Sequence, residues 1–270
     1  MNESVAFDQR AKKNINGIGD DQNFLDLTHT WLLSAHKHNY AYNFSWLGRP
    51  LIQIPQDIYA VQEIVWKVKP DLIIETGVAH GGSLILSASM MALLDYTDAI
   101  TTGSNLNPLE TKRQVIGIDI DIRHHNRAAL EEHPLYHLIK LIEGSSVEPG
   151  IIRQVKNIAA NYKRIMIFLD SNHTHEHVLK ELEAYAPLVS QGSYCVVWDS
   201  GVENLPDELI VDRPWRKGDN PKTALLEYIT MLEEGSIIAT DKEPLKFEID
   251  KEIEHKITIT ASEDGFLRRV

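Results

Sequence analysis

The stretch "PDLIIETGVAHGGSLILSAS", residues 70–89, decides the fold of this chain. Its first half is an apolar run of strand length that closes with an acid, Glu75, and then Thr-Gly. Its second half is apolar on all sides, which is typical of a buried helix. A glycine-bearing turn between a buried strand and a buried helix predicts the first unit of a parallel α/β sheet.

Strand-like and helix-like segments alternate along the rest of the chain. Apolar runs of strand length recur in "QVIGIDID" (114–121), "HLIKLIEGSS" (137–146), "RIMIFLDSN" (164–172) and "GSYCVVWDS" (192–200). Apolar residues at helical spacing recur in "PQDIYAVQEIVWKVKP" (55–70), "EPGIIRQVKNIAANY" (148–162), "HEHVLKELEAYAPLV" (175–189) and "NPKTALLEYITMLEEG" (220–235). Asn220 suits an N-cap before Pro221.

This alternation predicts an α/β fold built on a doubly wound, mostly parallel, Rossmann-like sheet. Two late strands in the tail 245–270 would bring the sheet to seven strands. Residues 1–50 are expected to form an N-terminal helical extension, of which residues 1–22 form a loosely held arm. Residues 51–270 are expected to form one domain.

Composition narrows the class of protein. The chain has 270 residues, is 43% hydrophobic, and carries a net charge of −12, so a polyanionic partner such as nucleic acid is not expected. No apolar run reaches the roughly 20 residues of a membrane span, and the N-terminus lacks the apolar core of a signal peptide. The single cysteine, Cys195, lies in an apolar run and is expected to be a buried thiol. We therefore expect a cytoplasmic protein without a membrane partner.

Polar residues follow every predicted strand. Glu75 ends the first strand, Asp119 the second, Ser145 the third, Asp170 the fourth and Asp199 the fifth. Any one of these can be a turn or capping residue. In doubly wound sheets, however, ligands bind outside the carboxyl ends of the strands, so five such ends together indicate a binding site.

The first loop distinguishes between ligands. A dinucleotide-binding fingerprint reads G-x-G-x-x-G, and its middle glycine lets the backbone approach the pyrophosphate. In this chain Ala79 replaces that glycine. Glu75, just before Gly77, suits an ammonium group better than a phosphate. Asp119 can accept hydrogen bonds from both ribose hydroxyls. These features favour S-adenosylmethionine, which joins a charged amino-acid end to an adenosine end.

Several motifs together resemble the cephalosporin hydroxylase family, which includes sugar O-methyltransferases. They span roughly residues 42–225 and read "NFSWLGRPLIQIPQD", "DLIIETGVAHGGS", "GIDIDIR", "EGSS", "LDSNHTHEHVLKELEAYAPLVSQGSY" and "NPKTAL". The resemblance implies a class I S-adenosylmethionine-dependent methyltransferase fold, a divalent metal that is usually Mg²⁺, and a homo-oligomer. The implied acceptor is a small molecule, a sugar or a similar hydroxylated metabolite.

The resemblance also implies roles for individual residues. It places Asp119 at the ribose, Ser145 near the adenine, and Asp170 against both cofactor and metal. His173 corresponds to a proposed general base, and Asp199 to a second metal ligand. The cofactor loop would supply the remaining contacts, Glu75, Gly77, His80, Gly81 and Ser83.

One position departs from the family pattern. Where the relatives have a Glu-Asp pair at the end of the fifth strand, this chain reads Trp198-Asp199, and an indole cannot bind metal. Ser200, Asn172 or water would then have to complete the metal shell, and the use of Mg²⁺ is in question. His175 and His177, close to His173 in sequence, are expected at the surface.

The expected chemistry is an in-line methyl transfer to a sugar hydroxyl, with a base or a metal to help remove the proton. The loop 212–221, which carries Trp215 among cations, is either a lid or a solvated surface loop; as a lid, its cations would hint at an anionic acceptor. A non-catalytic cofactor binder, an NAD-dependent sugar-modifying enzyme and a hydroxylase stay as alternatives. The hydroxylase is disfavoured because none of the twelve histidines has Asp or Glu two residues later.

Overall fold

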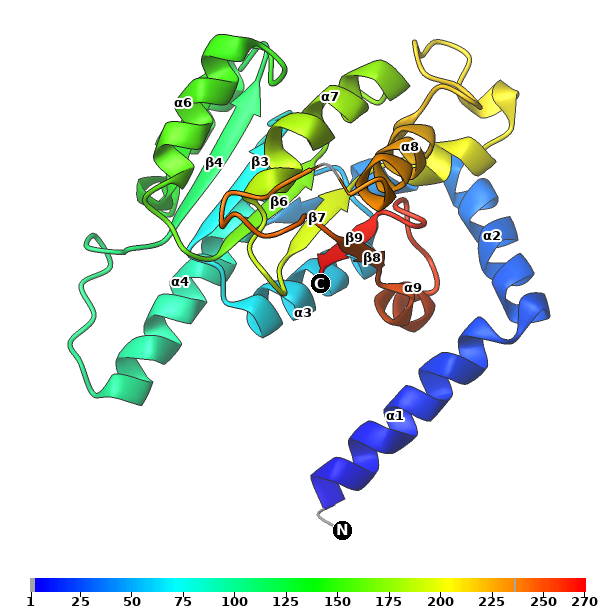
Figure 1. The fold of residues 1–270 in the computed structure, drawn as a ribbon, viewed down its shortest axis with the longest axis horizontal. Coiled ribbons are helices and arrows are strands. Elements are labelled where there is room, and N and C mark those ends of the chain that lie inside the picture. The colour runs from blue at the N-terminus through cyan, green and yellow to red at the C-terminus, as the bar shows by residue number, and fades with distance from the viewer. Residues whose placement is uncertain (1–2, 236) are drawn as a thin grey trace.

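The computed structural model describes residues 3–235 and 237–270 and is organised around a seven-stranded sheet (Figure 1). The strand order is β5-β4-β3-β6-β7-β9-β8. In chain order the strands are β3 (Leu72–Thr76), β4 (Gln114–Asp119), β5 (Ile139–Glu143), β6 (Ile165–Leu169), β7 (Tyr194–Val197), β8 (Phe247–Ile249) and β9 (Phe266–Arg269). Strands β3 to β7 are parallel to one another, and β9 is antiparallel to both β7 and β8. The predicted doubly wound, mostly parallel sheet is confirmed.

Helices cover both faces of the sheet (Figure 1). One face carries α3 (Pro55–Val68), α4 (Gly82–Thr102), α5 (His124–Glu131) and α9 (Lys251–Ile257). The other face carries α6 (Pro149–Ala159), α7 (His175–Tyr185) and α8 (Pro221–Glu233). Covering both faces buries β3, β6 and β7 completely, which is why their sequences are nearly continuous apolar runs.

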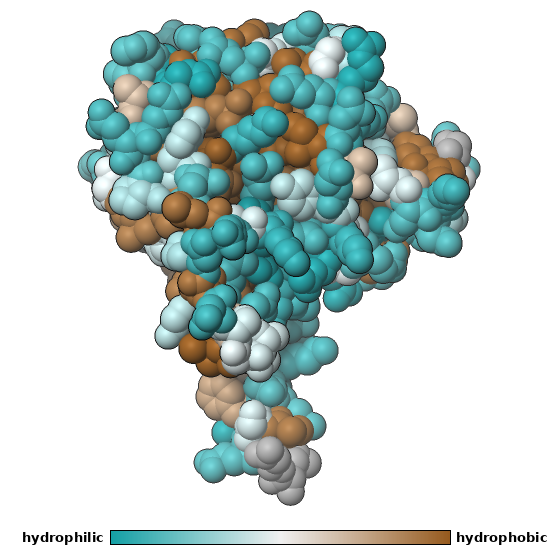
Figure 2. Space-filling model, turned by 90° about the vertical axis from the view of Figure 1, so that its left-hand side faces the viewer, coloured by the Kyte–Doolittle hydropathy of each residue, from teal (hydrophilic) through white to brown (hydrophobic). Residues whose placement is uncertain are grey.

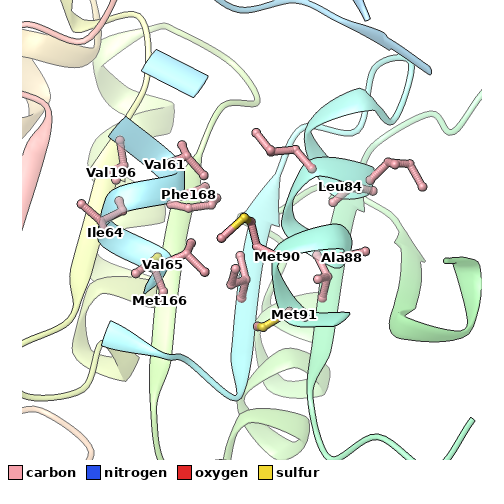
Figure 3. Close-up of a cluster of buried hydrophobic side chains, with 14 of the residues drawn as sticks. Val61, Ile64, Val65, Leu84, Ala88, Met90, Met91, Met166, Phe168 and Val196 are labelled. Carbon is pink, nitrogen blue, oxygen red and sulfur yellow. The ribbon is translucent and has the colours of Figure 1, made fainter. Parts of the chain in front are cut away.

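The side chains of β3 alternate between two cores. Ile73 joins the core under α3 and α4, and Leu72 and Ile74 join the core under α6, α7 and α8. Figure 3 shows the first core, where side chains of α3 and α4 meet Met166, Phe168 and other strand residues. The helix α4 is long and apolar enough to span a membrane, but half of its apolar window is buried inside this core. Packing in the sheet core explains the apolar composition between Gly82 and Leu94, where the buried residues of α4 lie.

The N-terminal segment is helical. It consists of α1 (Glu3–Gly19) and α2 (Gln22–His36), followed by a hairpin of β1 (Phe44–Trp46) and β2 (Arg49–Leu51). Figure 2 shows α1 standing out from the body of the molecule. Residues 3–19 are thus an ordered helix against α9, although Ile15 is the one residue buried along it. Met1 and Asn2 lie outside the described residues.

Two helices were not anticipated from the sequence. These are α5, and α9 between the two late strands. The side chain of Asp250 caps α9 by accepting a hydrogen bond from the Ile253 amide. Both helices have only seven or eight residues, too short for a clear apolar period.

The order of the strands fixes where a ligand can bind. From β3 the chain builds outward to β4 and β5, and then returns to place β6 on the other side of β3. The carboxyl ends of β3 and β6 are therefore neighbours at the point where the winding reverses. Ligands of open α/β sheets bind at such switch points.

Candidate functional site

The predicted acids gather along the carboxyl rim of the sheet. Glu75 belongs to β3 and Asp119 ends β4, while Asp170 and Asp199 follow β6 and β7. Parallel register brings these ends together: the amide of Asp170 donates to the Thr76 carbonyl over 2.9 Å. The rim thus unites residues that lie far apart in the sequence.

Glu75 is the buried acid of the rim. It is 1% exposed, and its Oε1 atom accepts a hydrogen bond from Ser83 Oγ at the start of α4. Its Oε2 atom is buried without a hydrogen-bond partner among the described residues. Burial raises the pKa of Glu75 to about 8. An unpaired buried carboxylate oxygen is costly, so it marks a place where a donor or a cation belongs.

The loop after Glu75 is shaped by its glycines. Gly77 has φ +90, and a Cβ there would lie 2.0 Å from the carbonyl oxygen of Asp170. Gly81, with φ +80, lies against the side chain of Leu130. Ala79 also has a positive φ, +44, where glycine is usual. The loop keeps the tight course of a glycine-rich turn even though its middle glycine is missing.

Two residues outside the predicted set hold this strained loop. Asn126 of α5, 3% exposed, donates from Nδ2 to the Ala79 carbonyl over 2.8 Å. Arg49 of β2 donates from Nε and NH2 to the His80 carbonyl, and from NH2 to Asn126 Oδ1. The imidazole of His80 lies on this same side, with Nδ1 3.4 Å from Asn126 Oδ1. Sequence reasoning missed both Arg49 and Asn126, since neither lies near the loop in the chain.

Asp119 is already engaged by backbone. Its Oδ2 atom accepts from the amides of Val78 and Ala79, at 2.8 and 3.3 Å, and its Oδ1 atom accepts from the amide of Asp121 at 3.1 Å. A carboxylate offers about four acceptor positions, so about one stays free. Asp119 therefore holds the loop in place and retains limited capacity for a ligand.

A polar network lies behind the third strand end. Ser145 makes a backbone turn to Glu148, while the adjacent Ser146 has its hydroxyl 3.0 Å from Nε2 of His177. The same Nε2 lies 3.1 Å from Ser171 Oγ, which donates to the completely buried Glu181. His177 thus joins the loop after β5 to the loop after β6. His177 is therefore not a free surface residue: these side chains partly enclose it, and 20% of its side chain stays exposed.

His175 is also not a free surface residue. Its ring contacts Thr223 Oγ1 through Nδ1 at 2.8 Å and Glu227 Oε2 through Nε2 at 3.2 Å. Its amide donates to Asp219 Oδ1. These three contacts tie the start of α7 to α8 and the turn before it. Asn220 begins α8 with a capping box, as its sequence predicts.

Asp170, His173 and Asp199 form the candidate metal centre. One ligand atom from each residue lies within 4.8 Å of the others. His173 Nε2 is 3.2 Å from Asp199 Oδ2. Burial raises the pKa of Asp170 well above its ordinary value, and the negative charge of Asp199 raises it further. A divalent cation would relieve this repulsion, so the donor set fits a metal.

Trp198 turns away from this centre. It is 4% exposed and packs between Phe168 and Phe266, with ring centroids 6.0 and 5.9 Å away. The indole belongs to the core under α3 and α4 and offers the centre no ligand. Two carboxylates and an imidazole are therefore the His and acidic donors grouped there among the described residues, and Ser200, Asn172 or water would have to fill the other positions around a bound metal.

The loop 212–221 reaches the centre through Trp215. The indole meets the His173 ring edge-on at a centroid distance of 4.6 Å and an angle of 90°. Arg213 lies 5.3 Å from the centre of the Trp215 ring and donates to the hydroxyl of Tyr42. The loop therefore covers His173 and is held by the segment before the sheet. Its residues 212–214 and 216–218 are exposed, so the role of the loop as a lid stays a prediction.

Asp57, in the first turn of α3, is a buried acid near enough to Asp199 to be affected by its charge, and sequence reasoning missed it. It is 1% exposed, accepts a hydrogen bond from the Ala261 amide at 2.9 Å, and has a second oxygen without a partner among the described residues. Burial raises its pKa to about 7, and the charges of Asp199 and Glu254 add to the rise. The one sequence feature that could have pointed to Asp57 is the motif "PQD", but an acid in the first turn of a helix also explains this motif.

The rim thus has two chemically different parts. Around Glu75 and Asp119, a buried acid and a tight loop can hold a ligand with an ammonium group and hydroxyls. Around Asp170, His173 and Asp199, the donors can hold a divalent cation or accept a proton. The two parts meet where Gly77 touches Asp170, so a ligand of the first part lies beside a substrate of the second.

Comparisons with known proteins identify the relatives of this chain. A family model described as Rhamnosyl O-methyltransferase/CmcI matches residues 38–270. The rhamnosyl O-methyltransferase of Mycobacterium bovis is 29% identical over 218 residues, which cover 79% of this chain and 73% of that protein. The rhamnosyl O-methyltransferase of Mycobacterium leprae is 28% identical over 234 residues, 86% of each chain. A solved structure of CmcI with Mg and SAM shares the fold at a TM-score of 0.50 and 16% identity, over 85% of this chain and 77% of that one.

Proposed function

Because the chain belongs to the rhamnosyl O-methyltransferase/CmcI family, we propose that it is an S-adenosylmethionine-dependent O-methyltransferase that methylates a hydroxyl group of a sugar or sugar-containing metabolite. The observation that carries the proposal is Glu75. Its unpaired, buried oxygen at the switch point, beside a glycine-rich loop, is the complement of the cofactor's ammonium group.

The cofactor supplies a methyl group made electrophilic by a positively charged sulfur. In our proposal Glu75 pairs with the ammonium group, and Ser83 holds the carboxylate in place. Asp119 uses its free acceptor position for a ribose hydroxyl. The turn at Ser145 lies near the adenine, and the loop contributes Gly77, His80 and Gly81. Asp170 borders the same pocket, since its carbonyl touches Gly77.

His173 takes the proton of the acceptor hydroxyl. Its Nε2 faces Asp199, which can stabilise the imidazolium that forms. Trp215 covers the imidazole and keeps water from it. Asp170 and Asp199 would hold Mg²⁺, which would lower the pKa of an acceptor hydroxyl. Most of the rate comes from aligning the hydroxyl with the methyl group.

A binding and transfer experiment tests this proposal. Calorimetry should detect binding of S-adenosylhomocysteine to the wild-type chain, and Glu75→Gln should weaken it at least tenfold. Labelled methyl groups from S-adenosylmethionine should appear on a methyl rhamnoside in the presence of Mg²⁺, and chelation should slow transfer. Absence of S-adenosylhomocysteine binding to the wild-type chain would contradict the proposed function.

A second candidate is a cofactor binder without catalysis. It is favoured by Trp198, because the family pair of acids is reduced to Asp199 alone. A binder of this kind would bind S-adenosylhomocysteine as tightly as an enzyme would, but would show no methyl transfer with or without Mg²⁺. The two measurements above separate these candidates.

The setting of the enzyme completes the proposal. We place it in the cytoplasm, which the unpaired, buried thiol of Cys195 suits, and burial raises the pKa of that thiol so that it stays unreactive. The projecting α1, with exposed Val5 and Phe7, favours a homo-oligomer. The division into an extension, 1–50, and a methyltransferase domain, 51–270, is part of the same proposal.

A further inference from the structure

The helix α2 forms one wall of a cavity. No residue of α2 is buried, although a helix beside a folded domain usually buries one face. Its residues Leu25, Thr28, His29 and Leu32 have the spacing of a single helix face, and all four line a cavity of about 790 Å³. The opposite walls come from residues 203–207 and from Lys251, Glu254, His255 and residues 258–260. This volume lies within the range of small-molecule sites, roughly 300–1,000 Å³.

The cavity borders two segments that also reach the proposed reaction centre. Thr260 lines it, and the next residue, Ala261, donates its amide to the buried Asp57. Lys217 lines another part, and it belongs to the loop whose Trp215 covers His173. Two walls of the cavity thus belong to segments that also contact Asp57 and His173. Asp170, His173 and Asp199 do not line the cavity themselves, so a molecule bound there would have to extend toward the centre that acts on it.

The charge of the walls restricts what can bind there. Five carboxylates line the cavity against two lysines, Lys217 and Lys251. Lys251 is already paired with Glu254 and Asp264, so its charge is neutralised within the protein. Such walls repel a diphosphate group but offer many acceptors to hydroxyl groups. The anionic acceptor suggested by the cations of loop 212–221 is therefore disfavoured.

We propose that this cavity binds the methyl acceptor, and that α2 selects an uncharged or cationic hydroxylated sugar over a nucleoside-diphosphate sugar. The inference rests on the proposed function and names its substrate class. It also locates selectivity in a helix that precedes the family-matched residues 38–270. Acceptor choice is then set by a part of the chain separate from the cofactor rim.

Filling the cavity from α2 tests the assignment. Leu32→Trp replaces an aliphatic side chain at the cavity wall with the larger indole. Leu27→Trp makes the same change on the outward face of α2, where Leu27 is 67% exposed. We expect Leu32→Trp to raise the KM for a methyl rhamnoside at least tenfold. The Kd for S-adenosylhomocysteine should stay within twofold of wild type, and Leu27→Trp should change neither constant. Thermal melting of each variant checks that it folds.

Other outcomes would overturn the inference. An unchanged KM in a folded Leu32→Trp variant places the acceptor elsewhere. A change in sedimentation mass of that variant alone identifies the cavity as a contact between two copies of the chain. The substrate class is contradicted if wild-type protein prefers a nucleoside-diphosphate rhamnose to the methyl rhamnoside. It is also contradicted if wild-type protein binds S-adenosylhomocysteine and methylates neither sugar. Failure to bind S-adenosylhomocysteine instead overturns the proposed function itself.

Discussion

His173 Nε2 lies 3.2 Å from Asp199 Oδ2, which links the loop after β6 to the end of β7. Asp199 adopts a left-handed backbone, φ +55, at this point. Such a conformation is unfavourable for a non-glycine residue, and it persists here where the carboxylate faces the imidazole. The geometry fits an acid that orients a base.

His173→Gln should lower kcat about 100-fold or more, because the variant loses the group that accepts the hydroxyl proton. The Kd for S-adenosylhomocysteine should stay near the wild-type value, since His173 lies outside the proposed cofactor contacts. His175→Gln is the matched control. It should cost about 1–2 kcal/mol of stability through lost contacts to α8, and leave kcat nearly unchanged. Equal kcat values for the two variants would contradict the assigned base.

Glu75→Gln should change how stability depends on pH. Burial raises the pKa of Glu75 from 4.5 to about 8, so between these values the folded protein holds a proton that the unfolded chain has released. The free energy of unfolding must therefore fall as pH rises through this window. Glutamine cannot ionise, so at pH 9 the variant should be more stable than wild type by on the order of 2–4 kcal/mol, and nearly equal at pH 4.5. Urea unfolding at pH 4.5, 7 and 9 measures this, and parallel curves would refute it.

Gly77→Ala should disrupt the loop at its contact with β6. A Cβ at this position would meet the Asp170 carbonyl oxygen at 2.0 Å, and φ is +90, so both space and backbone oppose a side chain. We expect a loss of about 2–4 kcal/mol in thermal unfolding and a large loss of S-adenosylhomocysteine affinity. Gly192→Ala, also at positive φ but with no atom within 4 Å of its Cβ, separates the cost of strain from the cost of the clash.

Trp198→Glu should fail to restore the family's second acid. The side chain lies in the core between two phenylalanine rings, so the exchange leaves a cavity and buries a carboxylate there. We expect a loss of about 3–5 kcal/mol, against about 1–2 kcal/mol for Trp198→Phe. A stable Trp198→Glu variant with tighter Mg²⁺ binding, measured by calorimetry, would show that this position can face the rim.

Asn126→Ala should destabilise the cofactor loop by removing a side chain that holds its backbone. The side chain holds the Ala79 carbonyl and accepts from Arg49, and Ala79 has the unfavourable φ +44. Leaving these groups unpaired should cost about 1–3 kcal/mol and raise the Kd for S-adenosylhomocysteine several-fold. Asn157→Ala, on α6 and away from the loop, is the control, and its affinity should match wild type.

The rim of acids could be predicted because it depends on local pattern. Each buried strand can be recognised in the sequence as an apolar run. The residue that follows such a run lies at the carboxyl end of the parallel sheet, however the helices pack. Glu75, Asp119, Asp170 and Asp199 could therefore be chosen from the sequence. Asp57 could not, because the partner of its carboxylate is the amide of Ala261, 204 residues further along the chain.

The sequence by itself determined the doubly wound sheet and the place of its ligand rim. The reason is that the spacing of apolar residues along a strand or helix reports which of its faces are buried. Only the tertiary structure decided how the rim is held and what lies beside it. It brought Asn126 to the loop, partly enclosed His177, turned Trp198 into the core and set α2 over a cavity. Such contacts join residues that are distant in the chain. They leave no periodic pattern in the local sequence, because each partner lies in a different segment.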